Sequence, residues 1–292
     1  MQAYGSGAAG FGWVGALAVG LLTAFVVAVF WLARHSQLVP RLLARVRGSA
    51  VVAWADRHFG EAAAALAKKS SLTVAAGLAL VAGFVVVAGF AAAFTEILED
   101  VLVGDGVNGV DGPAAEWLAG HREQWLTAAL KVVTIIGDSP TIAAIAVLVT
   151  AVAVWRSGTW FPAVVGLVGV AGIGLVIVTA KWVVGRSRPA PRFALLPEDG
   201  YSFPSGHATG TAAVALLCAW MVSRWVITSW AGRVVVWAIA VGVTGAVGFS
   251  RVYLGVHFVS DVLAGWLLGA AWAGAVIAVA SWWESTRSRV PG

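Results

Sequence analysis

Charged residues are scarce in this sequence: Asp, Glu, Lys and Arg make up only 11% of its 292 residues, whereas 60% are hydrophobic. Soluble domains contain about 25% charged residues. The composition and the mean hydropathy of +0.88 therefore exclude an ordinary soluble protein and indicate an integral membrane protein. The apolar runs are continuous rather than alternating, which predicts membrane-spanning helices and argues against a β-barrel.

Cysteine is also scarce: the sequence contains one, Cys218, which lies inside an apolar run. A disulfide framework is thus excluded, and we interpret Cys218 as a small core residue. The sequence has no Cys/His cluster with zinc-ligand spacing and no Walker-type nucleotide loop, so nothing in it calls for a metal or a cofactor. The net charge of +5 resides mostly in short loops between apolar runs, where it sets membrane topology and does not indicate nucleic-acid binding.

The first apolar run, residues 11–33, is followed by a basic segment, residues 34–71, and no positive charge precedes it. A secretory signal has the opposite polarity, so we expect an uncleaved helix with its N-terminus outside and the basic segment in the cytoplasm. Residues 51–68 fit either an amphipathic helix on the inner leaflet or an ordinary basic linker.

The remaining apolar runs predict six further spans, at residues 72–95, 138–155, 161–184, 207–222, 234–249 and 261–283. Between the first two lies an acidic stretch, residues 96–138, which we expect to be an exterior loop with an amphipathic helix at 114–136. The segment 185–206, rich in Pro, Gly and charge, is a second outer loop. The sequence thus predicts an all-α polytopic protein of about seven transmembrane helices, with the C-terminus inside.

Several basic residues contradict the rule that outer loops are poor in Lys and Arg. They fall at three outer helix ends: Lys181, Arg186, Arg188, Arg192 and Arg251. Lys181 is expected inside a span or at its edge, and a charge costs about 2.5–3.5 kcal/mol at the centre of a span on insertion scales. Snorkelling to the headgroups would explain each residue separately, but a shared anion explains the whole group.

Two nearby motifs supply chemistry for an anion. Pro204-Ser205-Gly206-His207 marks a helix start, where unpaired N–H groups and the helix dipole attract negative charge; an N-cap role for Ser205 alone leaves His207 unexplained. In Ser250-Arg251…His257…Asp261, the histidine and the aspartate are one helical turn apart. At that spacing the carboxylate can accept the ring N–H and leave the other nitrogen free as a nucleophile.

Together with Lys181…Arg188-Pro189, these motifs resemble the three-part signature of the type 2 phosphatidic acid phosphatase superfamily in residue type, spacing and order. That superfamily includes lipid phosphate phosphatases, acid phosphatases and vanadium haloperoxidases. The resemblance covers residues 72–283 and implies a six-helix transmembrane phosphatase core. Outside it lie residues 1–71, an extra N-terminal transmembrane helix with the basic segment, and residues 284–292, a cytoplasmic tail.

The resemblance implies a mechanism that needs neither metal nor cofactor. His257 attacks phosphorus and forms a phosphohistidine while Asp261 orients its ring; His207 protonates the leaving oxygen and later activates water. The phosphate oxygens are held by five residues: Lys181, Arg188, Ser205, Gly206 and Arg251. A neutral His257 and a protonated His207 predict a bell-shaped pH profile.

Arg186 and Arg192 are not required by the signature. We interpret them as interfacial residues, with binding of a second phosphate or of the lipid headgroup as the alternative.

These expectations describe a multi-pass enzyme of a bacterial cytoplasmic membrane, with its active site facing outward and a lipid phosphate as its partner. Polyprenyl diphosphate, phosphatidylglycerophosphate and phosphatidic acid all fit as substrates. The rival interpretation is a non-catalytic phospholipid- or anion-binding transport protein with the same basic pocket, which does not require the His–Asp pair and the second histidine. A haloperoxidase is a further alternative, but the relatives with that activity are soluble. The sequence does not indicate an oligomeric state.

Overall fold

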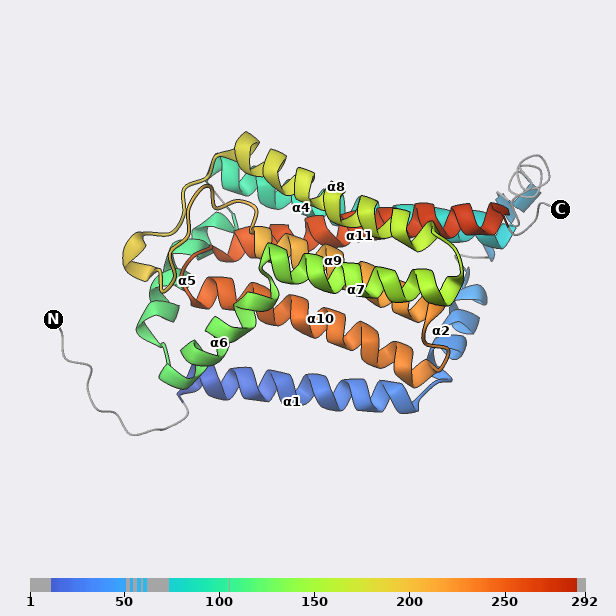
Figure 1. Cartoon of the computed structure of the whole chain (residues 1–292), viewed down its shortest axis with the longest axis horizontal. Helices are drawn as coiled ribbons and strands as arrows, with labels where there is room; N and C mark the ends of the chain where they lie inside the picture. Colours follow the sequence, from blue (N-terminus) through green and yellow to red (C-terminus); the bar gives the residue numbers. More distant parts are fainter. Residues whose placement is uncertain are drawn as a thin grey trace.

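The protein is a helical bundle in the part of the chain that the computed structural model describes, which comprises residues 12–50, 53–54, 57–58, 60–61, 74–104 and 106–287. The elements in chain order are α1 (Trp13–Arg34), α2 (Leu38–Arg47), α4 (Val74–Val103), α5 (Asn108–Gly120), α6 (Gln124–Ile136), α7 (Ser139–Ser157), α8 (Phe161–Val184), the 3₁₀ helix η1 (Pro191–Phe193), α9 (Gly206–Trp225), α10 (Trp230–Tyr253) and α11 (Val259–Arg287). The long helices run side by side, and α5, α6 and the loop between α8 and α9 gather at one end of the bundle (Figure 1).

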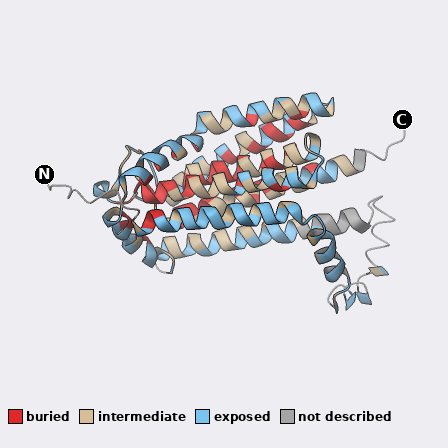
Figure 2. Cartoon of the chain, turned by 90° about the horizontal axis from the view of Figure 1, so that it is seen from below, coloured by how far each residue is buried: buried red, intermediate tan, exposed pale blue. Residues whose placement is uncertain are grey.

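Six helices of the described chain are long and apolar enough to cross a membrane, namely α1, α7, α8, α9, α10 and α11. The 30-residue α4 packs along α11 and completes a core of six helices, while α1 packs against α10 from outside that core. Exposed residues predominate on the outer helices (Figure 2), and many of them are large and apolar, such as Leu21 and Phe84. The predicted fold class is confirmed: this is an all-α polytopic membrane protein with a six-helix core and one extra N-terminal helix.

Helix α9 is the centre of the core, because it packs against α7, α8, α10 and α11. The contact between α9 and α11 relies on small residues: a Cβ at Gly265 would lie 2.9 Å from Thr209 Oγ1 and 3.1 Å from the carbonyl oxygen of Ser205. Lipid supplies no hydrophobic drive for the association of transmembrane helices, so their contacts depend on close packing, which small residues permit. The close approach brings the first turns of the two helices together, and the Ser205 N–H donates to the Asp261 carbonyl at 3.0 Å.

The bounds of α8 agree with the predicted span of residues 161–184, because strong local signals mark both of its ends. Pro162 lies in its first turn, where the missing N–H costs nothing. Gly185 follows its last residue with φ 64°, a left-handed conformation that glycine adopts without strain.

The prediction for residues 96–138 was wrong in two respects. Helix α4 continues to Val103 instead of ending at residue 95, and the single helix expected at 114–136 is two helices, α5 and α6. The chain breaks at Arg122 and Glu123 because both are bound to distant segments. The Arg122 guanidinium donates to the Phe193 carbonyl at 2.6 Å, and the Glu123 N–H donates to the Tyr253 hydroxyl at 2.8 Å.

The segment 51–68, for which an amphipathic helix and a basic linker were both open, lies outside the described residues except for residues 53–54, 57–58 and 60–61.

Candidate active site

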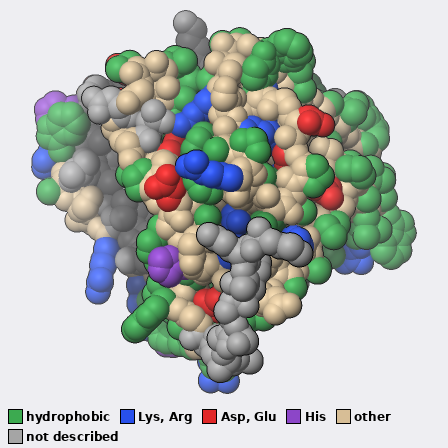
Figure 3. All heavy atoms as spheres, turned by 90° about the vertical axis from the view of Figure 1, so that its left-hand side faces the viewer, with side chains coloured by type: hydrophobic (Ala, Val, Ile, Leu, Met, Phe, Trp, Pro, Cys, Tyr) green, Lys and Arg blue, Asp and Glu red, His purple; other side chains and the backbone are tan. Residues whose placement is uncertain are grey.

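The three sequence motifs meet at the end of the bundle where α5, α6 and the 185–205 loop gather. Figure 3 looks onto this end and shows Lys and Arg side chains beside Asp and Glu near the middle of the face. Residues from the end of α8, the start of α9, the end of α10 and the start of α11 contribute to this cluster.

His257 and Asp261 form the predicted pair, with His257 Nδ1 3.2 Å from Asp261 Oδ2. The contact spans the start of α11 instead of lying within a helix, because His257 precedes the first residue of α11, Val259. Asp261 also accepts the Phe258 N–H at 2.9 Å, which caps the helix. The approach to this turn requires Gly255, whose φ is 73° and whose Cβ, if present, would collide with the Phe193 carbonyl.

Arg188 determines which nitrogen of His257 carries the proton. Its guanidinium lies 3.2 Å from His257 Nε2, and a guanidinium has donors only, so Nε2 is the acceptor and the proton resides on Nδ1, facing Asp261. Burial lowers the pKa of His257 to about 4, although the hydrogen bond that the ring donates to Asp261 opposes this shift. The ring is therefore neutral near pH 7. The lone pair of Nε2 is directed at a cluster of basic side chains, Lys181, Arg188 and Arg251, called the basic cluster below.

The basic cluster surrounds a carboxylate, that of Glu198. This carboxylate contacts Arg251 and lies 3.5 Å from Arg188, so two of the predicted phosphate-binding cations already share an anion. Burial alone would raise the pKa of Glu198, but the charge and hydrogen bond of Arg251 outweigh it and lower the pKa overall. Arg251 is 1% exposed, and its Nε has no hydrogen-bond partner among the described residues.

Lys181 and the start of α9 border the same cluster. The Lys181 ammonium donates to the Tyr201 carbonyl, and a Cβ at Gly206 would lie 3.8 Å from Lys181 Cε. Ser205 is the N-cap of α9, since its side chain accepts the Ala208 N–H at 3.5 Å. Its own N–H is bound to the Asp261 carbonyl, so the Ser205 amide predicted to hold phosphate already has a partner.

His207 has a carboxylate partner that the sequence interpretation missed. His207 Nε2 lies 2.8 Å from Asp138 Oδ1, at the start of α7. Asp138 is the N-cap residue of α7 but makes no capping bond with its side chain, which contacts the histidine instead. Gly137 permits this approach, because a Cβ there would lie 3.0 Å from His207 Cδ2. The only local signal was an aspartate before Ser139-Pro140, which is typical of any helix start.

Arg186 lies inside the site, which corrects its interpretation as an interfacial residue. Its guanidinium lies 2.7 Å from Asp261 Oδ1 and 2.7 Å from Asp111 Oδ2, and it covers the Phe258 ring at 4.4 Å. Asp111, which is 2% exposed, also accepts the Ser260 N–H at 3.0 Å. The chain therefore holds Asp261 through a buried network that sequence reasoning missed.

Arg192, by contrast, is exposed and 3.5 Å from an exposed Glu116.

Comparison with known proteins places this architecture in a family. Residues 162–285 match the model of the PAP2 superfamily. Phosphatidylglycerophosphatase B of Bacillus subtilis is 34% identical over 149 residues, which cover 51% of this chain and 72% of that protein. The chain belongs to the PAP2 superfamily. The resemblance inferred from the three motifs is thus confirmed, and all eight predicted site residues lie inside the matched range, whereas Asp111 and Asp138 precede it.

Other PAP2 relatives match over shorter stretches. The undecaprenyl-diphosphatase of Sulfolobus acidocaldarius is 38% identical over 97 residues, 31% of this chain and 41% of that protein. Decaprenylphosphoryl-5-phosphoribose phosphatase of Mycobacterium tuberculosis is 36% identical over 116 residues, 37% of this chain and 58% of that protein.

The fold has a counterpart among solved structures. The crystal structure of a transmembrane PAP2-type phosphatidylglycerolphosphate phosphatase from Bacillus subtilis superposes with a TM-score of 0.61 at 26% identity, covering 70% of this chain and 97% of that chain. This PAP2 protein is a multi-pass membrane lipid phosphatase, and the rival interpretation as a non-catalytic transport protein is set aside.

Proposed function

We propose that this PAP2 protein hydrolyses a lipid monophosphate or diphosphate at the outer face of a bacterial cytoplasmic membrane, through a phosphohistidine on His257. The observation that carries the proposal is the pair of contacts on that ring. Asp261 accepts a hydrogen bond from Nδ1–H, and the Nε2 lone pair is directed at the basic cluster where a phosphate would bind. A fixed tautomer with an unprotonated nitrogen facing the phosphate site is what a histidine nucleophile requires.

In the first step, Nε2 attacks phosphorus, an N–P bond forms, and the P–O bond to the lipid breaks. His207 gives its proton to the departing lipid oxygen. In the second step, His207 removes a proton from water, the water oxygen attacks phosphorus, and the N–P bond breaks to release the phosphate. Asp138 holds the His207 ring in both steps through the 2.8 Å contact.

Five residues, Lys181, Arg188, Arg251, Ser205 and Gly206, bind the phosphate oxygens in this proposal. Phosphate replaces the Glu198 carboxylate between Arg188 and Arg251, because both anions require the same guanidinium donors. The Nε of Arg251, which has no hydrogen-bond partner in the described part of the chain, is an additional donor for an oxygen of the transferred group. These cations stabilise the charge that spreads over the oxygens in the transition state.

The outward orientation rests on the distribution of charge between the two ends of the bundle. Arg34, Arg156 and Arg224 lie in the last turns of α1, α7 and α9, at the end away from the motifs. Loops rich in Lys and Arg stay in the cytoplasm, so the site then faces outward. The names of the relatives support lipid phosphates and diphosphates as substrates, which leaves phosphatidylglycerophosphate, polyprenyl diphosphate and phosphatidic acid to be compared.

A substrate panel in detergent, with EDTA present, tests the proposal. Wild type should release phosphate from at least one of the three lipids, and His257→Gln and His207→Gln should each lower kcat by at least about 10³-fold while inserting normally in the membrane. Labelled phosphate trapped on the enzyme during turnover should be acid-labile and attached to His257. Acid-stable phosphate on serine or threonine, or turnover by His257→Gln close to wild type, would refute the phosphohistidine. Arg192→Gln, at an exposed pair at the same end, is the matched control.

A further inference from the structure

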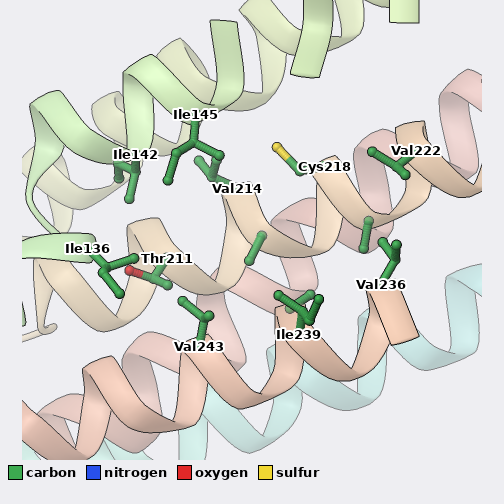
Figure 4. A pocket seen from close by; sticks show the side chains of 13 residues that line it. Ile136, Ile142, Ile145, Thr211, Val214, Cys218, Val222, Val236, Ile239 and Val243 are labelled. Atoms are coloured by element: carbon green, nitrogen blue, oxygen red, sulfur yellow. The ribbon is translucent and has the colours of Figure 1, made fainter. Parts of the chain in front are cut away.

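An apolar cavity of about 240 Å³ lies between α7, α9 and α10 (Figure 4). Its walls are aliphatic and come from all three helices, for example from Ile142 of α7, Val214 and Val222 of α9, and Ile239 of α10. Thr211 is the only side chain in the lining that carries a hydroxyl, and Cys218 contributes a thiol. An apolar site of this kind does not attract water and suits hydrocarbon.

One end of this cavity adjoins the acid–base histidine. Thr211 follows His207 by one helical turn on α9, so the two side chains share a face of that helix. The turn before α7 links them as well: a Cβ at Gly137 would lie 3.0 Å from His207 Cδ2 and 3.2 Å from Thr211 Oγ1. The Thr211 hydroxyl is buried and has no hydrogen-bond partner among the described residues, which leaves a donor next to the lipid oxygen that His207 protonates.

The cavity extends from there along α9 toward the opposite end of the bundle. Thr211 and Val222 mark its limits on α9, and eleven residues at 1.5 Å each give a length of about 16 Å. That is roughly half of the hydrocarbon thickness of a bilayer, about 30 Å. Because the cavity runs along α9, a candidate membrane span, its long axis follows the membrane normal, the direction in which a lipid chain lies.

The cavity is also open to the side. Both α7 and α10 pack against α9, and both contribute side chains to the cavity wall. Ile145 of α7 is 42% exposed and Ile239 of α10 is 59% exposed, although both line the cavity. A chain in the bilayer thus has direct access between α7 and α10.

We propose that this cavity, called the groove below because it is open to the bilayer, binds one hydrocarbon chain of the lipid phosphate. The chain enters from the bilayer between α7 and α10. The assignment rests on the proposed function, because it is the lipid oxygen protonated by His207 that connects the chain to the phosphate. Held in the groove, the chain fixes that oxygen beside His207, so binding energy remote from phosphorus serves orientation at the reacting centre.

Continuity with the site distinguishes this groove from a larger cavity of about 440 Å³ between α8 and α11. Trp160 and Trp283 line the larger cavity, and they lie at the ends of α8 and α11 opposite Lys181 and Asp261. Its lining residue on α11 nearest the site, Trp272, is still eleven residues after Asp261, or about 16 Å along the helix, so a chain bound there would not adjoin His207.

Filling the groove tests the assignment with two substrates that share a headgroup, dioleoyl phosphatidate in mixed micelles and water-soluble dibutyryl phosphatidate. Ala215→Phe places an aromatic ring in the groove, and Val147→Phe places the same ring on the exposed side of α7. For Ala215→Phe we expect kcat/KM to fall at least about tenfold on the long-chain lipid and to stay within about twofold on the short-chain one, whereas Val147→Phe changes neither. Equal activity of Ala215→Phe and wild type on both lipids would overturn the assignment.

A cross-linking experiment decides the matter if Ala215→Phe fails to fold. A long-chain alkyl phosphate with a diazirine at mid-chain should label peptides from residues 211–222 and 236–243 of wild type, and exclusive labelling of α4, α8 or α11 would refute the groove. His257→Gln separates the two proposals. It should lose hydrolysis and retain the labelling; retained hydrolysis would refute the phosphohistidine alone, and label absent from both proteins would refute the groove alone.

Discussion

Replacing Asp138 by asparagine tests whether this carboxylate keeps His207 in its acid form. The substitution preserves size and removes the charge 2.8 Å from His207 Nε2. A hydrogen bond between charged partners contributes about 1.5–3 kcal/mol. Because Asp138 is 45% exposed, solvent screening reduces this to about 1–1.5 kcal/mol, close to a tenfold change in the equilibrium between imidazolium and imidazole.

The expected result is a change in one limb of the pH profile. The carboxylate stabilises the protonated ring, so its loss should move the alkaline limb of kcat/KM to lower pH by about one pH unit. On the acidic side of that limb, where the ring is protonated in both proteins, the rates should agree within about twofold. The other charges near His207, Arg251 and Glu198, remain in the variant and affect both profiles alike.

Phosphate release measured from about pH 5 to about pH 9 gives this profile. Asp138→Glu should restore most of the limb position, because the charge returns on a longer side chain. Glu116→Gln removes the same charge from an exposed site at the same end of the bundle and should leave the profile unchanged. A uniform loss of rate at every pH in Asp138→Asn would show a purely structural role, and superimposable profiles would show that the contact is irrelevant; either outcome refutes the reasoning.

Two further predictions concern the buried pair at His257. Because burial lowers the pKa of His257 to about 4, the nucleophile stays neutral above that pH. The kcat/KM of wild type should therefore be constant down to about pH 5 and fall as the pH drops through about 4. An acid limb centred near pH 6.5, the ordinary histidine pKa, would contradict this prediction. Arg186→Gln leaves Asp111 and Asp261 buried without their shared cation, so it should cost about 3–5 kcal/mol of stability, measured as thermal unfolding in detergent, together with most of the activity. Arg186→Lys should recover stability better than activity, because an ammonium lacks the planar fork that reaches both carboxylates, and stability equal to wild type in Arg186→Gln would refute the network.

The spans and the three motifs could be predicted from sequence because their signals are local. A long apolar run in a membrane forms a helix, because a helix satisfies its backbone hydrogen bonds within the segment. Pro162 and Gly185 mark the ends of α8 through local conformational preferences alone. Charges at the outer helix ends were informative for a related reason: Lys181 and Arg251 sit where a charge is costly, so a shared anion was the simplest explanation.

The two missed carboxylates carried no such signal. Asp111 and Asp138 lie in an acidic stretch that is typical of a solvated loop, and their partners are distant in sequence: Ser260 and Arg186 for Asp111, His207 for Asp138. Only the fold decides whether such a side chain faces water or the site. Arg186 was misjudged for the same reason, since nothing in Arg186-Ser187-Arg188 indicates that the first arginine turns toward Asp261 and the second toward Glu198.

The environments of the two carboxylates argue for different duties of the two histidines. Asp261 is fully buried and fixed by Arg186, so the His257 ring has one tautomer and little freedom, as a nucleophile that must meet phosphorus in line requires. Asp138 is half exposed and reaches His207 at the edge of the site, where the proton delivered to the lipid oxygen is regained from the attacking water in the second step. If the roles were exchanged, protons would have to enter and leave at a pair that is 0–2% exposed and enclosed by Arg186 and Asp111. The burial of each dyad, rather than its presence, therefore assigns attack to His257 and proton transfer to His207.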